Sequence, residues 1–429
     1  MIARCAIPTP RLQWRVLTGN SPRSRFALFG ALYFAQGVPW GFFTVALQLR
    51  LTKLGLSPGA LGEVMTLAWL PWAAKPLLGP LVDRVSFGRW GRRRPFVLLA
   101  EAGMAVSLML LATADPASRL TLFSVLVFLH NVFAAAQDVG VDALALDLLT
   151  PDERGRANGI MSAGQYGGMV VGGQGLIWVA NQLGWPAAFG AAVVLLLLPA
   201  TLILGVREGP APAQRLPLGP LLWRSFAVRV VILAVVFAFV FDLSDGLLRP
   251  MMFPLMQRQL GYSDQQVATL ATLAGLMGVV GSLVGGALSD RLGRRWGLLL
   301  ACLGVALTDF IFAGGRASWG SYAFVLVLGL AGAMASGMVS ASSVAMFMDL
   351  TNRRLGATQF QIYMSVMNLR TSAATYGGGH LADRTSPQAM FVLGGIVELV
   401  PLALLPLLDA RRAQKAFAQT ETTAAPANG

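Results

Sequence analysis

The sequence carries little charge and few residues of the kinds that bind metals or form disulfides. Only 12% of its 429 residues are charged, whereas an average soluble domain carries about 25%. Two cysteines and two histidines are too few for a disulfide framework or a structural zinc site. The HExxH, G-x-S-x-G and Walker patterns are absent as well. We therefore predict a protein that is not an enzyme, binds no metal and no cofactor, and is not an ATP-driven pump.

Apolar residues dominate the composition instead. They make up 55% of the chain, and the mean hydropathy is +0.63. Twelve stretches are long and apolar enough to cross a hydrocarbon core of about 30 Å. They are residues 26–49, 60–81, 95–114, 120–146, 157–180, 186–206, 226–247, 265–289, 297–314, 319–347, 357–379 and 387–408. The sequence predicts an all-α membrane protein with twelve transmembrane helices embedded in a lipid bilayer.

The basic residues lie in short clusters between these stretches. The net charge of +13 would suggest nucleic acid as a partner of a soluble protein. Here, however, 24 of the 33 Lys and Arg residues fall on one side of the predicted membrane and 7 on the other. This bias is the positive-inside pattern. It predicts that both termini are cytoplasmic and that nucleic acid is not a partner.

The chain repeats itself across a proline-rich linker. Three short segments recur in the same order at offsets of 207, 210 and about 202 residues. The pairs are Gly79–Arg84 with Gly286–Arg291, Gln165–Met169 with Thr375–Gly379, and Leu146–Thr150 with Met348–Thr351. We predict two pseudo-symmetric six-helix halves. The expected divisions are a tail (1–25), a first half (26–206), a linker (207–225), a second half (226–408) and a polar tail (409–429).

The first of these repeats belongs to a longer charged motif. Its members are Gly79, Asp83, Arg84, Gly91, Arg92 and Arg93 in one copy and Gly286, Asp290, Arg291, Gly293, Arg294 and Arg295 in the other. This motif resembles the loop between the second and third spans of each half in the major facilitator superfamily. The resemblance implies a substrate site at the midplane between the halves. It also implies a cytoplasmic charge network that locks one conformation and releases another.

Four further segments resemble one group within that superfamily. They are FAQGVPWGF (34–42), GRRRP (91–95), AQDVGVDALALDLLTPDERG (136–155) and GATQFQIYMSV (356–366). The group contains AmpG-type muropeptide permeases together with acetyl-CoA and siderophore transporters. The resemblance implies a monomeric secondary transporter of a bacterial inner membrane, with muropeptide-type import favoured. Siderophore import, drug or metabolite efflux, and a receptor or assembly factor that transports nothing are the alternatives.

Acids inside the predicted spans are the first candidates for chemistry. Asn131, Asp138 and Asp142 are seven and four residues apart, so they share one helix face. A charge inside a membrane helix is expensive and marks a functional site by default. We predict proton coupling by Asp138, Asp142 or Asp242. Alternatively, Asp142 pairs with a basic loop residue as a gate, and Asp242 belongs to an outer gate.

Polar and aromatic residues in the spans are candidates for binding the substrate. They are Gln36, Trp40, Asn131, Gln137, Tyr166, Arg370 and Tyr376. Arg370 lies midway along its span with no acid one turn away, and an arginine there can bind an anionic group bidentately. The alternative for Arg370 is an ion pair with Asp309 or Glu398. The alternatives for Gln36 and Trp40 are helix packing and the membrane interface.

Three other features have structural interpretations. Lys75 and Glu101 come from adjacent spans, and we expect them to form an internal ion pair. His130 is expected to make a structural hydrogen bond. The glycines at positions 164, 168 and 172 form a small-xxx-small face, which predicts close packing against another helix.

Overall fold

The structure is a computed structural model that describes residues 21–84, 87, 90–150, 153–206, 208, 228–351 and 356–422. Most of the expected tail 1–25 and of the expected linker 207–225 therefore lies outside the described residues, as do the side chains of Asp83 and Arg84. The described secondary structure consists of helices, and it contains no strand. The all-α prediction is confirmed for this part of the chain.

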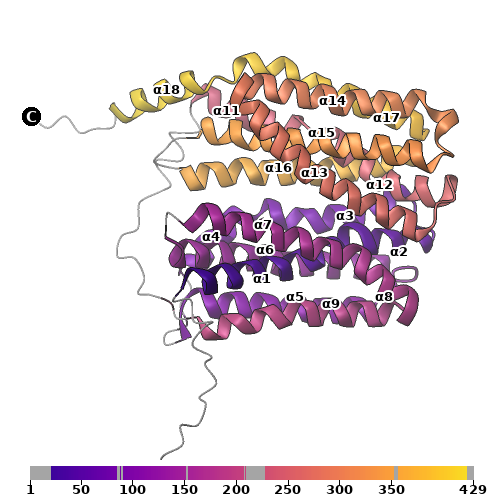
Figure 1. Cartoon of the computed structure of the whole chain (residues 1–429), viewed down its shortest axis with the longest axis horizontal. Coiled ribbons are helices and arrows are strands. Elements are labelled where there is room, and N and C mark those ends of the chain that lie inside the picture. Colours follow the sequence, from indigo (N-terminus) through magenta and orange to yellow (C-terminus); the bar gives the residue numbers. More distant parts are fainter. Residues whose placement is uncertain are drawn as a thin grey trace, which may run out of the picture.

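The helices run alternately between two ends of the molecule (Figure 1). We call the end where α1 begins the near end and the opposite end, with the loop 54–57, the far end. The elements that run from near to far are α1 (Pro22–Gly41) with η2 (Phe42–Ala46) and α2 (Leu47–Lys53), α5 (Arg93–Thr113), α7 (Arg154–Val170) with η5 (Val171–Gly175) and α8 (Leu176–Leu183), α11 (Arg229–Val240) with α12 (Leu243–Pro254) and η7 (Leu255–Gln259), α14 (Arg294–Gly314), and α16 (Gly356–Ala382).

The returning elements run from the far end to the near end (Figure 1). They are α3 (Pro58–Ala73) with α4 (Lys75–Arg84), α6 (Leu120–Leu148), α9 (Trp185–Ala200) with η6 (Thr201–Gly205), α13 (Asp264–Leu292), α15 (Tyr322–Asp349), and α17 (Pro387–Leu399) with η9 (Val400–Leu407). The helix α18 (Ala410–Thr422) follows at the near end, and the short η8 (Arg316–Ser318) lies in a far-end loop. Figure 1 shows α1–α9, the first set, on one side and α11–α18, the second set, on the other.

Nine helical runs among the described residues are long and apolar enough to cross a membrane. The expected spans 60–81, 157–180 and 357–379 coincide instead with α3–α4, α7–η5–α8 and α16. The first is interrupted, because α3 ends at Ala73 after 16 residues. The other two are less apolar than their neighbours because they contain glycines together with amide and arginine side chains. These polar helices supply the residues that matter most below.

Several far-end helices start at serine caps. Ser57 accepts a hydrogen bond from the backbone N–H of Ala60, at 3.2 Å, and the proline that follows Ser57 fits the first helical position. Ser386 caps α17 in the same way, and Ser263 forms a reciprocal capping box with Gln266. Short loops that end in a cap allow consecutive helices to reverse direction.

Glycine brings α1 and α7 into backbone contact. A Cβ atom at Gly168 would lie 2.2 Å from the carbonyl oxygen of Phe34, and one at Gly172 would lie 1.9 Å from that of Val38. Gly164 faces Gly30 in the same way. The predicted small-xxx-small packing is confirmed. The second set repeats it between α13 and α15, where a Cβ atom at Gly281 would lie 2.0 Å from the carbonyl oxygen of Met334.

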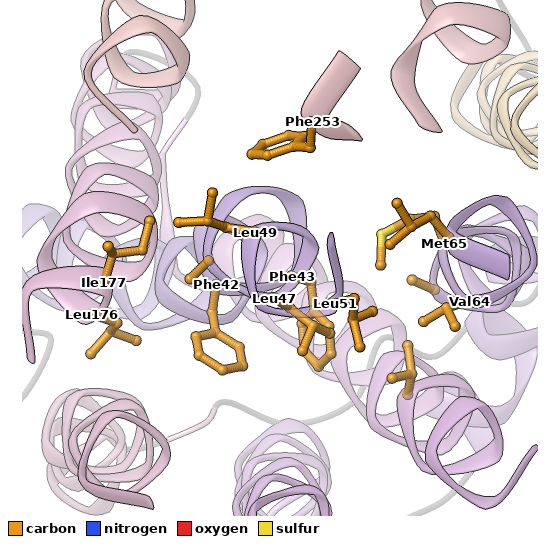
Figure 2. Close-up of a cluster of buried hydrophobic side chains, with 14 of the residues drawn as sticks. Phe42, Phe43, Leu47, Leu49, Leu51, Val64, Met65, Leu176, Ile177 and Phe253 are labelled. Atoms are coloured by element: carbon orange, nitrogen blue, oxygen red, sulfur yellow. The ribbon is translucent and has the colours of Figure 1, made fainter. Parts of the chain in front are cut away.

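A hydrophobic cluster closes the far part of the molecule. Figure 2 shows Phe42 and Phe43 of η2 beside Leu47 and Leu49 of α2, with the side chain of Phe253 from α12 near them. All five side chains are buried. Because Phe253 belongs to the second set, this cluster joins the two sets as well as the helices within the first.

Candidate functional site

The first intramembrane ion pair forms where α3 gives way to α4. Pro76 has no N–H to donate to the carbonyl of Trp72, four residues earlier, so the helix is broken there. The side-chain amide of Asn368, on α16, supplies the missing donor to that carbonyl at 3.2 Å. Lys75 stands at the break, and its ammonium group pairs with the carboxylate of Asp138 on α6. The lysine side chain is 19% exposed and the aspartate side chain 9%.

The carboxylate of Asp138 is shared with α1. Its other oxygen accepts a hydrogen bond from the side-chain amide of Gln36. The oxygen of that amide accepts a hydrogen bond from Gln165 of α7 at 3.2 Å. One turn nearer the near end, the hydroxyl of Tyr33 donates to Asp142. Charge and hydrogen bonds therefore connect α1, α4, α6 and α7.

A small cavity of about 20 Å³ adjoins Gln36, which is room for about one water molecule. The ring of Trp40 makes edge-to-face contacts with Trp69, at 4.7 Å, and with Trp72, at 5.0 Å. The indole N–H of Trp72 donates to the side-chain oxygen of Asn131 at 3.2 Å. Three predicted binding residues, Gln36, Trp40 and Asn131, thus line one cavity. Its walls combine aromatic faces with amide groups.

The second intramembrane ion pair also lies at a helix break. Asp242 separates α11 from α12 and has a φ angle of 52°, the one positive value among the described non-glycine residues. Arg370 of α16 donates to the Asp242 carboxylate at 2.8 Å and to the Phe241 carbonyl at 2.9 Å. Its guanidinium carbon lies 4.6 Å from the centre of the Phe241 ring. The arginine therefore satisfies a carbonyl that the break would leave without a partner.

Two predicted ion pairs are wrong. Lys75 does not pair with Glu101, because the break between α3 and α4 turns it toward α6 and Asp138. Glu101 instead accepts a hydrogen bond from Gln137 at 3.2 Å. Arg370 pairs with Asp242 rather than with Asp309 or Glu398, because the broken helix brings Asp242 to it.

The predicted binding residues Gln137, Tyr166 and Tyr376 do not line this cavity. Gln137 is fully buried against Glu101. Tyr166 is 36% exposed on α7, and Tyr376 is 50% exposed and contacts the ring of His380. His130 is a structural hydrogen-bonding residue as predicted, since its Nδ1 lies 2.9 Å from the Ser107 hydroxyl.

The charged motif lies at the near end in both copies. In the first, Arg92 and Arg93 form ion pairs with Asp147, at 3.0 and 3.3 Å, at the end of α6. The backbone N–H groups of both arginines also donate to Glu208. Gly91 precedes them with a φ angle of 97°, a conformation that glycine adopts without strain.

The second copy of the motif forms equivalent ion pairs. Arg294 pairs with Asp349 at 3.0 Å and with Asp290 one turn earlier. Asp349 lies in the last turn of α15, as Asp147 lies in the last turn of α6. Arg295 donates to the Leu408 carbonyl at 3.1 Å. A Cβ atom at Gly79 or Gly286 would meet nothing within 4 Å. Arg291 and Gly293 are exposed.

The far end holds a different set of contacts, which bridge the two sets of helices. Lys53 pairs with Asp264, and Ser57 donates to Asp383 at 2.9 Å. His380 lies 3.2 Å from Glu63. Deeper along α3, the Thr66 hydroxyl donates to the Ser372 carbonyl at 3.1 Å, and Ser372 returns a bond of 2.9 Å. The contacts follow α3 and α16 from the far end toward the two ion pairs.

Several of these residues were not predicted from the sequence. Trp69 and Trp72 lie three residues apart on α3, one turn before Lys75, so a scan for aromatic side chains on the face of a charged residue finds them. Tyr33 lies three residues before Gln36 on α1 and is found in the same way. Asn368 and Glu208 give no such signal, because each acts on backbone groups of distant segments.

Comparisons with known proteins agree with this arrangement. The Major Facilitator Superfamily profile matches residues 29–242 and 234–428. A Rickettsia conorii protein named as a transporter, AmpG 4, is 26% identical over 400 residues, which cover 89% of this chain and 95% of that one. The anhydromuropeptide permease of Escherichia coli K12 is 26% identical over 358 residues, covering 80% of this chain and 71% of the permease.

The fold resembles that of a solved transporter. The crystal structure of a D-xylose–proton symporter superposes with a TM-score of 0.72 at 14% identity and covers 91% of this chain and 98% of that one. The family profile spans both sets of helices, and the resembling proteins are transporters and permeases, not enzymes. This chain belongs to the Major Facilitator Superfamily.

Proposed function

We propose that this protein is a proton-coupled secondary transporter that carries a small polar or amphipathic solute across a bacterial inner membrane by alternating access. The observation that carries the proposal is the Lys75–Asp138 pair beside the cavity of Trp40, Trp69 and Trp72. A carboxylate that can exchange its cation partner for a proton, next to groups that can hold a solute, is the arrangement that coupling requires.

The proposal includes the membrane topology. Twelve spans form two pseudo-symmetric six-helix halves, residues 26–206 and 226–408, and the near end faces the cytoplasm. The paired networks Arg92–Asp147 and Arg294–Asp349 support the repeat. The excess of Lys and Arg at the near-end segments supports the orientation. The unit is a monomer in the lipid bilayer.

The contacts favour an arrangement that is open toward the cytoplasm. At the far end, ion pairs and hydrogen bonds such as Lys53–Asp264 and Ser57–Asp383 bridge the two sets. At the near end, the ion pairs Arg92–Asp147 and Arg294–Asp349 each stay within one set. We infer that the far-end contacts form the closed outer gate and that they break when the site opens to the outside.

The side chains that line the cavity, rather than its volume of about 20 Å³ in this conformation, have chemistry that suits a sugar-containing solute. Flat indole faces pack against the apolar faces of sugar rings, and amide side chains such as those of Gln36 and Asn131 can exchange hydrogen bonds with hydroxyl or acetamido groups. Muropeptide-type import is therefore the favoured substrate class, and the similarity to the Escherichia coli anhydromuropeptide permease supports it. Siderophore import and efflux of drugs or metabolites are the alternative outcomes.

The test measures proton movement driven by solutes in proteoliposomes that contain the purified protein. The panel comprises muropeptide fragments, siderophores and cationic drugs. We expect muropeptide fragments to drive proton uptake in the wild type, and Asp138→Asn to abolish it while solute binding remains. Asp115→Asn, in an exposed far-end loop, is the control and should behave as wild type. If properly folded wild-type protein moves none of these solutes, the receptor or assembly-factor alternative is favoured.

A further inference from the structure

A buried carboxyl group on α17 has no role in the site described so far. Glu398 is 1% exposed, and neither of its oxygens has an N–H or O–H donor among the described residues. Removing an ionised carboxylate from water without a partner costs several kcal/mol or more. Glu101, the other glutamate that is buried among the described residues, accepts a hydrogen bond from Gln137. A buried group that stays without such a donor requires an explanation.

The groups around Glu398 explain what it can do. One turn earlier on α17, a Cβ atom at Gly394 would lie 3.0 Å from the Asp309 carboxylate and 2.7 Å from the Ser244 hydroxyl, so this face of α17 packs against α14 and the start of α12. The charged and titratable side chains that act on Glu398 are Cys302 and Asp309 of α14, Asp242 at the break before α12, and Arg370 of α16. Asp309 already accepts a hydrogen bond from the hydroxyl of Ser244, and the Cys302 thiol is a weak donor. Arg370 is the cation that acts on both Glu398 and Asp242; Arg249, which also acts on Asp242, is paired with Asp245. Charge balance therefore requires that protons neutralise the acids that Arg370 does not hold.

Arg370 has capacity for a second partner. Its two terminal nitrogens hold the Phe241 carbonyl and the Asp242 carboxylate, but its Nε atom is buried and has no hydrogen-bond partner among the described residues. An unused donor of Arg370 and the unused acceptors of Glu398 thus lie in one buried cluster.

Asp242 is the partner that can leave. It stands in a left-handed backbone conformation, which costs an ordinary residue on the order of 1 kcal/mol and persists only while its contacts hold it. Its side chain is 18% exposed, whereas that of Arg370 is 6% exposed. A proton or a cationic group of the solute can therefore reach Asp242 without entering the buried cluster.

We propose that Glu398 is a proton-binding site that works in alternation with Asp242. When Asp242 is ionised and bound to Arg370, Glu398 carries a proton. When Asp242 takes up a proton and releases Arg370, the guanidinium turns to Glu398, which gives up its proton and becomes the ionised partner. One proton is bound and one is released, so the charge of the cluster does not change. This inference deepens the proposed transport function and rests on it for its physiological meaning.

The first arm of the test detects the proton on Glu398 directly and needs no substrate. Infrared spectra of the reconstituted protein would be recorded at neutral pH for wild type and Glu398→Gln. We expect a protonated-carboxyl band in the wild type that the variant lacks. The same band should disappear in Asp242→Asn, because Arg370 then turns to Glu398 and ionises it. Glu101→Gln is the matched control, since it removes an equally buried glutamate but should not alter this band.

Two results would overturn the proposal. The wild type and Glu398→Gln could show the same protonated-carboxyl spectrum, or the Glu398 band could persist in a folded Asp242→Asn protein. If Asp242→Asn does not fold, a pH titration of the wild type replaces it. The Glu398 band should then reappear or vanish together with the band of Asp242, and independent titration of the two would contradict the alternation.

The second arm separates this inference from the proposed function. Solute-driven proton movement would be measured in proteoliposomes with wild type, Glu398→Gln and Glu101→Gln. We expect Glu398→Gln to lose at least ten-fold in proton-driven accumulation while downhill solute movement remains, and Glu101→Gln to resemble wild type. If wild type shows no coupling, the proposed function fails. If wild type and Glu398→Gln couple equally, the function stands and the role of Glu398 fails.

Discussion

The two intramembrane ion pairs look alike in composition but differ in how firmly they are held. The cation of the first, Lys75, has a flexible stem, is 19% exposed, and lies 4.5 Å from the centre of the Trp72 ring. The cation of the second, Arg370, is 6% exposed, donates to a backbone carbonyl and is stacked on Phe241. An ammonium group can leave its carboxylate by rotating its stem. The Arg370 guanidinium stays anchored by the carbonyl and the ring of Phe241 and, in the proposed alternation, releases Asp242 only as Glu398 takes its place.

This difference suggests a division of labour. The first pair adjoins the aromatic cavity and shares its carboxylate with Gln36, so a solute there can disturb it directly. The second pair holds a broken helix together through the Phe241 carbonyl. Both helix breaks depend on α16. Asn368 donates to the free carbonyl of Trp72, and Arg370, two residues further along α16, donates to the free carbonyl of Phe241. A movement of α16 therefore affects both pairs at once.

The largest effect is expected from breaking the firmly held pair. Arg370→Ala leaves Asp242 and the Phe241 carbonyl without their buried donor. We expect a loss of about 3–5 kcal/mol in stability, the usual cost of removing one member of a buried pair. Thermal unfolding in detergent measures it. Arg370→Lys keeps the charge but not the two-point hold, so it should recover only part of the loss. An Arg370→Ala protein as stable as wild type would refute the structural role of this pair.

The next prediction concerns a substitution that pushes α1 away from the Lys75–Asp138 pair. In Gly168→Ala the added methyl group would lie 2.2 Å from the Phe34 carbonyl oxygen, so α1 and α7 must separate. We expect a cost of about 1–3 kcal/mol and a weaker contact of Gln36 with Asp138. Gly159→Ala, on the same helix, is the matched control because its Cβ atom would meet nothing within 4 Å. Equal unfolding temperatures for the two variants would contradict the packing argument.

The loosely held pair should be less important for stability and more important for transport. Lys75→Met keeps the apolar stem over Trp72 and removes the charge. We expect a stability loss of about 2 kcal/mol, from a carboxylate that keeps Gln36 as a hydrogen-bond donor. Proton-coupled uptake should be lost altogether. Thermal unfolding and proteoliposome uptake on the same preparations test both parts. A larger stability loss in Lys75→Met than in Arg370→Ala would contradict the prediction that the second pair contributes more to stability than the first.

The sequence predicted the fold class and many of the polar residues, but not which of them meet. Spacing on one helix identified the face of Asn131 and Asp138, because that face depends on the helix period alone. The partner of Lys75 was predicted wrongly because Pro76 breaks the helix and changes the direction of the side chain. Whether a proline breaks a span depends on a donor elsewhere in the chain, here Asn368, which no local pattern reveals.

The polar helices and the cavity also depend on contacts that the sequence does not reveal. Hydropathy found the apolar helices, but α16 and α7 combine polar side chains with glycine, and their place in the bundle comes from contacts with α3 and α1. Trp69 and Trp72 look like ordinary interfacial residues in the sequence. Only the approach of α1, which brings Trp40 against both rings, makes them the wall of a cavity.

The smallest effect is expected at the near end, where Arg25 pairs with Glu153 outside the membrane core. The hydrogen bond from the Arg25 side chain holds the pKa of Glu153 below its ordinary value of 4.5. A lowered pKa in the folded state means that the pair stabilises the protein above about pH 4.5 and loses this contribution as the pH falls through the folded-state pKa. Arg25→Gln should therefore lower the unfolding temperature slightly at pH 7 and by less at pH 3.5. Arg23→Gln, exposed on the same turn, is the control and should show no such difference between the two pH values. An Arg25→Gln effect that is the same at both pH values would mean that the near-end pair contributes through packing alone.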